Sequence, residues 1–114
     1  MQIERAEIGA ITVLRLQGDL DEIGVNALRD AFYECLRAGR FHLVLNMAEV
    51  RYISYLGVGV MVERLRKVRS FKGDLKLAGL NLHANRLFRM VGVSSLFETY
   101  ENEAQALRVF QEAA

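Results

Sequence analysis

Residues 41–60 read FHLVLNMAEVRYISYLGVGV and carry the two signals on which the predicted fold rests. The first is the short apolar run from Phe41 to Leu45, which is typical of a buried β-strand. The second is Ser54, because a serine hydroxyl at the start of a helix accepts a backbone N–H that the first turn leaves unpaired. We therefore expect a helix that begins near Tyr55, and a loop over residues 47–53 that leads to it.

Strand and helix signals alternate on both sides of this stretch. β-Branched and apolar runs indicate strands, whereas apolar residues three and four apart indicate helices. The expected strands are residues 2–6, 11–16, 75–78 and 96–100, and the expected helices are residues 80–90, residues 101–110 and a helix from Val25 to a stop at Gly39. A turn at Gly9-Ala10 would pair the first two strands, and the later strands would follow helices as parallel crossovers. We predict an α/β fold with a mixed β-sheet of about four to five strands packed by about four helices.

Helical spacing also predicts which side chains face the core. Those side chains are, helix by helix, Val25, Leu28, Phe32, Cys35 and Leu36; Leu56, Val60, Leu65 and Val68; Leu82, Leu87 and Met90; and Ala104, Leu107 and Phe110. A dense basic cluster accompanies the second helix and comprises Arg64, Arg66, Lys67, Arg69 and Lys72. We interpret this cluster as a solvated helix face. A docking patch for an acidic partner is the alternative that stays open.

The composition is that of a soluble globular chain. The 114 residues are 52% hydrophobic and 25% charged, with a net charge of +1 and a single cysteine, Cys35. The near balance of charge gives no general attraction for nucleic acid, and one cysteine permits no internal disulfide and suits a reducing compartment. No apolar run approaches the roughly 20 residues that cross a bilayer, and we find no secretory signal. We expect one cytoplasmic domain over residues 1–114, with no nucleic acid bound and no membrane insertion.

Residues that could carry catalysis or hold a metal are scarce. His42 and His83 lack a Cys, His or carboxylate partner at ligand spacing, and Cys35 falls on an expected buried face. Gly57-Val58-Gly59 begins like a dinucleotide fingerprint, but residue 62 is Val62 rather than the third glycine. We therefore expect a protein that is not an enzyme and uses no cofactor. We interpret both glycines as positions of close helix–strand packing.

The order of several fragments along the chain adds a family resemblance. Residues 43–60 are accompanied by Gly18-Asp19-Leu20-Asp21 before the first helix, by GDLKLAGL at residues 73–80, by LFRMVGV at residues 87–93, and by Phe97 and EAQAL at residues 103–107. Together these fragments resemble the STAS domain, the module of bacterial anti-sigma-factor antagonists and of sulfate-transporter tails. The resemblance spans nearly the whole chain.

One position departs from the family pattern. In the antagonists, the turn before the second long helix usually reads Asp-Ser-Ser-Gly-Leu-Gly, and the anti-sigma factor, which is also a kinase, phosphorylates the second serine. Placing Gly57-Val58-Gly59 on Gly-Leu-Gly puts Ser54 at the aspartate, Tyr55 at the first serine and Leu56 at the phosphoacceptor. Leu56 has no hydroxyl, so the resemblance implies that the usual charge-based off-switch is absent. The sequence leaves open whether Leu56 is buried or forms an exposed docking spot.

The resemblance implies a non-catalytic protein-binding module in a regulatory partner switch, whose partner is an anti-sigma factor of the histidine-kinase-like ATPase class. Asn46 replaces the aspartate that commonly ends the preceding strand, whereas Asp21 matches an acidic position of the family's Gly-Glu-Leu-Asp segment. The expected partner-binding residues are Asp21, Ser54, Tyr55, Leu56, Gly57, Val58 and Arg64. Ser54 is also an alternative phosphorylation site, although helix capping explains it without that role. Three alternatives stay open: a constitutive subunit of a transporter or stress-signalling scaffold, a weak nucleotide-binding protein that uses Gly57 at the helix start, and a homodimer.

Overall fold

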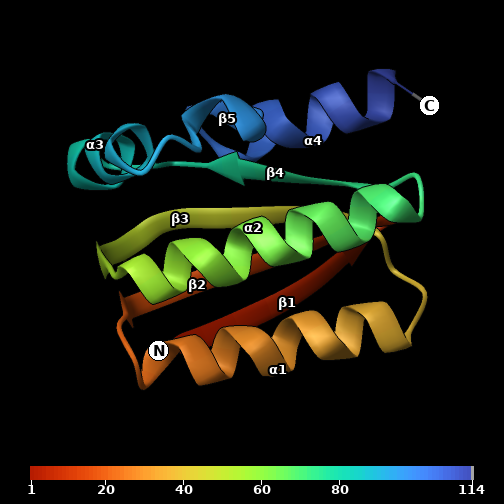
Figure 1. The fold of residues 1–114 in the computed structure, drawn as a ribbon. Helices are drawn as coiled ribbons and strands as arrows, with labels where there is room; N and C mark the ends of the chain where they lie inside the picture. Colours follow the sequence, from red (N-terminus) through yellow and green to blue (C-terminus); the bar gives the residue numbers. More distant parts are fainter. Residues whose placement is uncertain (114) are drawn as a thin grey trace.

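The computed structural model describes residues 1–113, which form one mixed β-sheet and the helices that cover its two faces. The strands are β1 (Gln2–Ile8), β2 (Ile11–Leu20), β3 (His42–Ile53), β4 (Asp74–Ala78) and β5 (Thr99–Tyr100). The helices are α1 (Gly24–Arg37), α2 (Tyr55–Ser70), α3 (Leu82–Met90) and α4 (Glu103–Glu112), with a short 3-10 helix, η1 (Ser94–Leu96), before β5. The predicted α/β fold, with a mixed sheet of about four to five strands packed by about four helices, is confirmed (Figure 1).

The strands lie in the sheet in the order in which they occur along the chain. The β1 strand returns antiparallel onto β2, as the predicted turn at Gly9-Ala10 requires. From β2 onward every pairing is parallel, because α1, α2 and α3 each return the chain to the end of the sheet where the previous strand began. The carboxyl ends of β2, β3 and β4 therefore lie together, and so do the first turns of the helices that follow them.

The loop expected over residues 47–53 was a wrong prediction, because β3 continues as a strand to Ile53. It pairs there with an equally unexpected extension of β2 from Gln17 to Leu20. Two irregularities in register interrupt this pairing, so the buried residues Met47, Val50 and Ile53 come at intervals of three rather than two. A spacing of three removes the alternation by which a strand is recognised in sequence.

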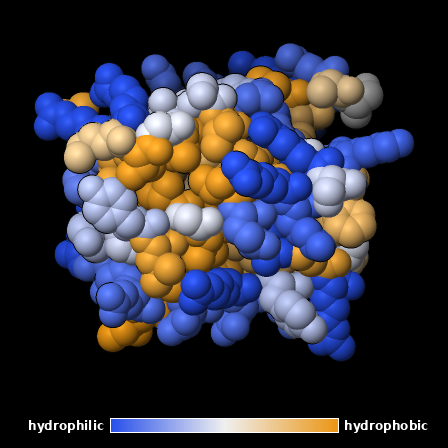
Figure 2. Space-filling view, in the orientation of Figure 1, coloured by the Kyte–Doolittle hydropathy of each residue, from blue (hydrophilic) through white to orange (hydrophobic). Residues whose placement is uncertain are grey.

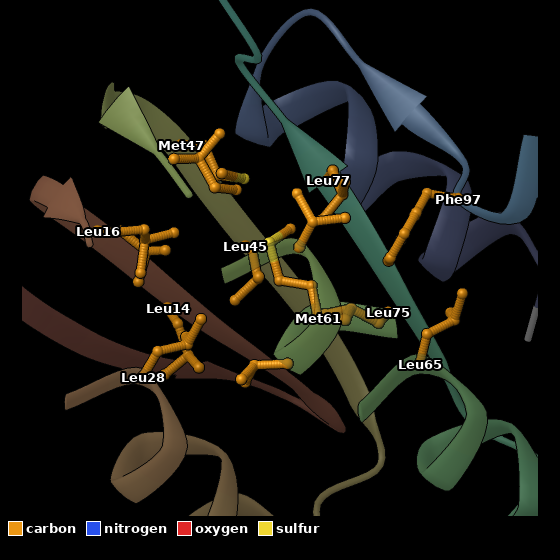
Figure 3. Packing of buried hydrophobic residues seen from close by; sticks show 14 of the residues in the cluster. Leu14, Leu16, Leu28, Leu45, Met47, Met61, Leu65, Leu75, Leu77 and Phe97 are labelled. Atoms are coloured by element: carbon orange, nitrogen blue, oxygen red, sulfur yellow. The ribbon is translucent and has the colours of Figure 1, made fainter. Parts of the chain in front are cut away.

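The larger core lies between one face of the sheet and the helices α1, α2 and α3. Alternate residues of the three central strands point toward these helices, where their side chains meet those of Leu28, Met61 and Leu65 (Figure 3). The strand residues concerned are Leu14, Leu16, Leu43, Leu45, Leu75 and Leu77. A smaller cluster on the opposite face joins Val13 and Val44 to Ala106 of α4. Burial on both faces explains why the central strands read as nearly continuous apolar runs.

Most predicted helix faces are confirmed, and the errors fall at helix ends. The buried residues of α1 are Gly24 and four of the five expected ones, Val25, Leu28, Phe32 and Cys35, whereas the fifth, Leu36, is half-buried. In α3, by contrast, Leu82 and Met90 are the first and last residues and are exposed, so only Leu87 of the predicted face is buried. Ala104 of α4 is also exposed, and Ala106 is the buried residue of that helix.

Helix α4 is fixed to its face of the sheet by a charged group as well as by apolar contact. Glu103 accepts two hydrogen bonds from Arg15, at 2.8 and 2.9 Å, and a third from Asn46 Nδ2 at 3.0 Å. The hydrogen bond from Arg15 is the main reason that the pKa of Glu103 lies below its ordinary value. Asn46, at the family's aspartate position, therefore helps to anchor α4 on the face opposite α1 and α2.

Candidate functional site

The candidate site lies where the parallel strands end and the helices on the larger core begin. Helices α1, α2 and α3 all start at this edge, on the left in Figure 1. The backbone N–H of Ser54 donates to the carbonyl of Leu20 at 2.9 Å, which holds the start of α2 against the end of β2. Asp21 and the turn at Ser54, both expected to bind the partner, therefore belong to segments that are neighbours in space.

Ser54 caps α2 as predicted. Its Oγ accepts a hydrogen bond from the backbone N–H of Gly57 at 3.1 Å, which is one of the donors that the first turn of a helix leaves unpaired. The Gly57 N–H is consequently engaged, which leaves it unavailable to the weak anion site considered for nucleotide binding. The hydroxyl of Ser54 thus has a structural role that needs no modification.

Leu56 is exposed, in contrast to the predicted buried stripe of α2. Leu56 and its neighbour Tyr55 retain 42% and 64% of their accessible surface, whereas Val58 is buried. Gly57 occupies the inward position of this turn, because a Cβ there would lie 3.2 Å from Ile53 Cγ1 and 3.3 Å from the Leu20 carbonyl oxygen. The turn therefore presents Tyr55 and Leu56 outward on a support formed by Gly57 and Val58.

Asp21 orders the neighbouring loop through its own backbone. Its Oδ1 accepts hydrogen bonds from the N–H groups of Ile23, at 3.1 Å, and Gly24, at 2.7 Å, at the start of α1. This arrangement places the side chain of Ile23 in solvent, where it is 82% exposed. Asp21 thus fixes the backbone that carries Ile23.

Arg64 is not the solvated residue that the sequence predicted. Its side chain is only 13% exposed, and its guanidinium lies over the ring of Phe32, 5.5 Å from the ring centroid. Its Nε has no hydrogen-bond partner among the residues that the structure describes, and Nη2 lies 3.4 Å from Glu63. Arg64 is therefore a half-satisfied cation between α1 and α2, two turns beyond Leu56.

Sequence reasoning missed three exposed apolar residues at the same edge. Ile23 precedes α1, Tyr52 lies near the end of β3 beside His83, with ring centroids 5.9 Å apart, and Leu82 opens α3. Together with Tyr55 and Leu56 they form a set that we call the apolar rim. In Figure 2, apolar surface gathers toward this end of the molecule, and hydrophilic surface prevails toward the far end of α2. Their position in the sequence could have identified these residues, because each of them adjoins the end of a strand or the start of a helix.

The groove beside the rim runs between α1 and α2. It has a volume of about 560 Å³, with Tyr33 and Leu56 among its apolar walls and Glu63 and Arg64 among its charged ones. A larger hollow, of about 640 Å³, lies at the other edge of the sheet near Ile8, His42 and Phe110 and is remote from the rim. The groove, rather than the larger hollow, adjoins the residues that the sequence singled out.

The described residues offer little for metal or covalent chemistry. Within residues 1–113, no group of three or more His, Cys, Asp or Glu side chains is placed to hold a metal ion. Cys35 is buried, and this burial raises the pKa of its thiol, which disfavours the reactive thiolate. Among these residues we find no helix that has both the length and the apolar character needed to span a bilayer.

Comparisons with known proteins agree in one family. The STAS domain model matches residues 2–106. An anti-sigma F factor antagonist from Paenibacillus polymyxa is 26% identical over 108 residues, which cover 94% of this chain and 92% of the relative. An anti-sigma-B factor antagonist from Staphylococcus epidermidis is 25% identical over 88 residues, or 77% of this chain and 82% of the relative. The solved structure of the antagonist SpoIIAA in its unphosphorylated form has a TM-score of 0.85, with 97% of each chain covered at 18% identity, and so shares the fold.

Proposed function

The chain belongs to the STAS domain family, and from that premise we propose that it is a protein-binding module of a regulatory partner switch, which docks onto an anti-sigma factor of the histidine-kinase-like ATPase class. Its relatives named as anti-sigma factor antagonists support a regulatory role of this kind. The observation that carries the proposal is the exposure of Leu56 at the start of α2, within an edge that also presents Ile23 and Leu82. An apolar side chain held outward in this way favours contact with another protein.

The contact that we propose is apolar and is centred on Leu56. Full burial of a leucine side chain is worth about 1.5–3 kcal/mol, so covering the exposed part of Leu56 contributes about 1 kcal/mol. A carboxylate in its place would have to be desolvated in the interface without a counter-charge, which costs considerably more. Substitution by glutamate is therefore a far stronger perturbation than truncation to alanine.

The proposed contact is not switched by phosphate at residue 56. Phosphorylation of a serine adds nearly two negative charges and disrupts an apolar interface through repulsion and desolvation. Leu56 cannot accept that group, and the hydroxyl of Ser54 already receives the Gly57 N–H. We propose that partner release depends on other events, such as competition by a second protein.

The exposed leucine also favours a second candidate, a constitutive subunit of a larger assembly. A permanent interface needs lasting apolar burial and no phosphoacceptor, and Leu56 meets both requirements. Recovery of the chain from cell extract in fixed stoichiometry with transporter or scaffold subunits would support this candidate. Exchange between free and bound pools would support the switch instead.

The proposed function is tested by calorimetric titration with the kinase-like anti-sigma factor encoded in the same genome. Wild-type protein should bind, and Leu56→Glu should weaken binding at least about 100-fold, as expected for a central interface residue. Met90→Glu provides the matched control, because Met90 is also exposed but lies at the far end of α3. Equal affinity of wild type and Leu56→Glu would remove Leu56 from the interface, and absence of any wild-type binding would refute the proposed partner class.

A further inference from the structure

Two glycines in α2, Gly57 and Gly59, have opposite surroundings. A Cβ at residue 57 would lie 3.2 Å from Ile53 Cγ1 and 3.3 Å from the Leu20 carbonyl oxygen, which is tight packing that favours glycine there. A Cβ at residue 59 would meet no other atom within 4 Å, and Gly59 is exposed. The expectation that both glycines permit close helix–strand packing is therefore right for Gly57 and wrong for Gly59.

Gly59 is unfavourable for the helix that contains it. Glycine inside a helix is less stable than alanine, because it has more backbone freedom to lose on folding and covers less of the backbone. Here no neighbouring atom and no positive φ angle compensates for that loss. Packing within the described residues does not explain glycine at this position.

The surface around Gly59 is open on two sides. Gly59 lines the groove between α1 and α2 and also a second hollow, of about 480 Å³, along the outer side of α2. A side chain at residue 59 would stand between these two depressions. Tyr33, which is 61% exposed, and Leu56 provide apolar walls on the α1 side. The backbone of α2 is therefore accessible at Gly59 beside an apolar wall.

The charge around the two hollows is predominantly basic. Arg29, Arg64, Arg66 and Lys67 line them, against Asp30 and Glu63. Among the residues that the structure describes, Arg29, Arg66 and Lys67 form no ion pair. The one ion pair of Arg64 within the same residues is its 3.4 Å contact to Glu63, and its Nε has no hydrogen-bond partner among them. Carboxylates from outside would complement this surface.

We infer that Gly59 is the point of closest approach for an amphipathic, acidic helix of the partner protein, lying along the groove between α1 and α2. Helices pack by fitting side-chain ridges into grooves, and a missing side chain lets two backbones come closer. The apolar side of the incoming helix would contact Tyr33 and Leu56, and its carboxylates would face Arg64, Arg66 and Lys67. This inference rests on the proposed function, because Leu56 belongs to both surfaces.

The test separates stability from binding at residue 59. Leucine is a good helix former and its Cβ would meet open space there, so Gly59→Leu should keep or raise the melting temperature. The same variant should weaken binding of the kinase-like anti-sigma factor by about tenfold or more, because its side chain would fill the approach point. Gly57→Leu should instead lower the melting temperature, because the same side chain would be forced against Ile53 and the backbone of Leu20. Gln111→Leu places a leucine on α4, across the sheet, and should leave the affinity unchanged.

Charge provides a second readout. The double variant Arg66→Glu/Lys67→Glu should weaken binding, and affinity of the wild type should fall as salt is raised. If Leu56→Glu abolishes binding while Gly59→Leu binds like the wild type, the helix docking is wrong and the proposed function stands. If the wild type does not bind at all, both fail. Unchanged affinity of the charge-reversed variant at low salt would overturn the acidic character of the incoming helix.

Discussion

Asp21 offers a direct test of how the site is held together. The sequence predicted that Asp21 contacts the partner, and in the structure its Oδ1 accepts the N–H groups of Ile23 and Gly24. Asp21→Ala removes this acceptor, and Asp21→Asn keeps a carbonyl oxygen in its place without the charge. The pair of variants separates loss of the hydrogen bonds from loss of the carboxylate.

The expected destabilisation follows from the two donors. The N–H of Ile23 can be hydrated after Asp21→Ala, because this residue is largely exposed. The N–H of Gly24 is in a buried residue, and an unsatisfied buried donor costs about 1–3 kcal/mol. We therefore expect Asp21→Ala to lower the free energy of unfolding by about 2 kcal/mol and Asp21→Asn by less than about 1 kcal/mol.

Urea denaturation at neutral pH measures this difference, and titration with the anti-sigma factor measures binding of the same samples. If Asp21 acts by ordering the loop, affinity should fall in step with stability, so that Asp21→Asn binds nearly as well as the wild type. Equal stability of wild type and Asp21→Ala would refute the role of Asp21 in ordering this loop. Loss of binding in Asp21→Asn with stability retained would instead place the carboxylate directly against the partner.

Two further predictions concern other parts of the chain. Glu103→Gln should lower the free energy of unfolding by about 1–2 kcal/mol at pH 7, since hydrogen bonds to a charged group are lost. The folded state depresses the pKa of Glu103, so the stabilisation by its ionised carboxylate is fully present above the ordinary carboxyl pKa of about 4.3 and is lost as the pH falls through the folded-state pKa. The difference in unfolding free energy between wild type and Glu103→Gln should therefore shrink toward pH 3. A difference that does not depend on pH would contradict the ion pair. Leu56→Ser restores a hydroxyl where the family usually has its phosphoacceptor, and incubation with the anti-sigma factor and ATP should add one phosphate to this variant, detectable by mass spectrometry. Phosphate on the wild type at residues 54–56 would show that the turn is modified without that serine.

The sequence predicted most of the fold because long apolar patterns are robust to local error. Helix α1 packs on the sheet over the whole stretch that carries Val25, Leu28, Phe32 and Cys35, so helical spacing alone identified its buried face. Leu82 and Met90 also fit helical spacing, but they lie at the ends of α3, where the helix extends beyond the residues it packs on. Spacing identifies a face and says little about where the underlying surface ends.

The site was predicted less completely, for physical reasons that particular residues illustrate. Capping by Ser54 could be read from the sequence because it is local, and the structure confirms it. The exposure of Leu56 could not, because it depends on Gly57 packing against Leu20, a residue more than thirty positions away. Arg64 was misjudged for a similar reason, since its stacking on Phe32 requires the packing of α1 against α2. The apolar rim itself forms only when the ends of several strands are brought to one edge.

The paired extension of β2 and β3 bears on the thermodynamics of association. Backbone hydrogen bonding continues past both irregularities of register to Leu20 and Ile53, and the Ser54 N–H adds one more link before α2 begins. The exposed side chains therefore stand on backbone that is already ordered. A partner would meet a surface that loses little conformational entropy on complex formation, and the free and bound backbones of this edge should superpose closely.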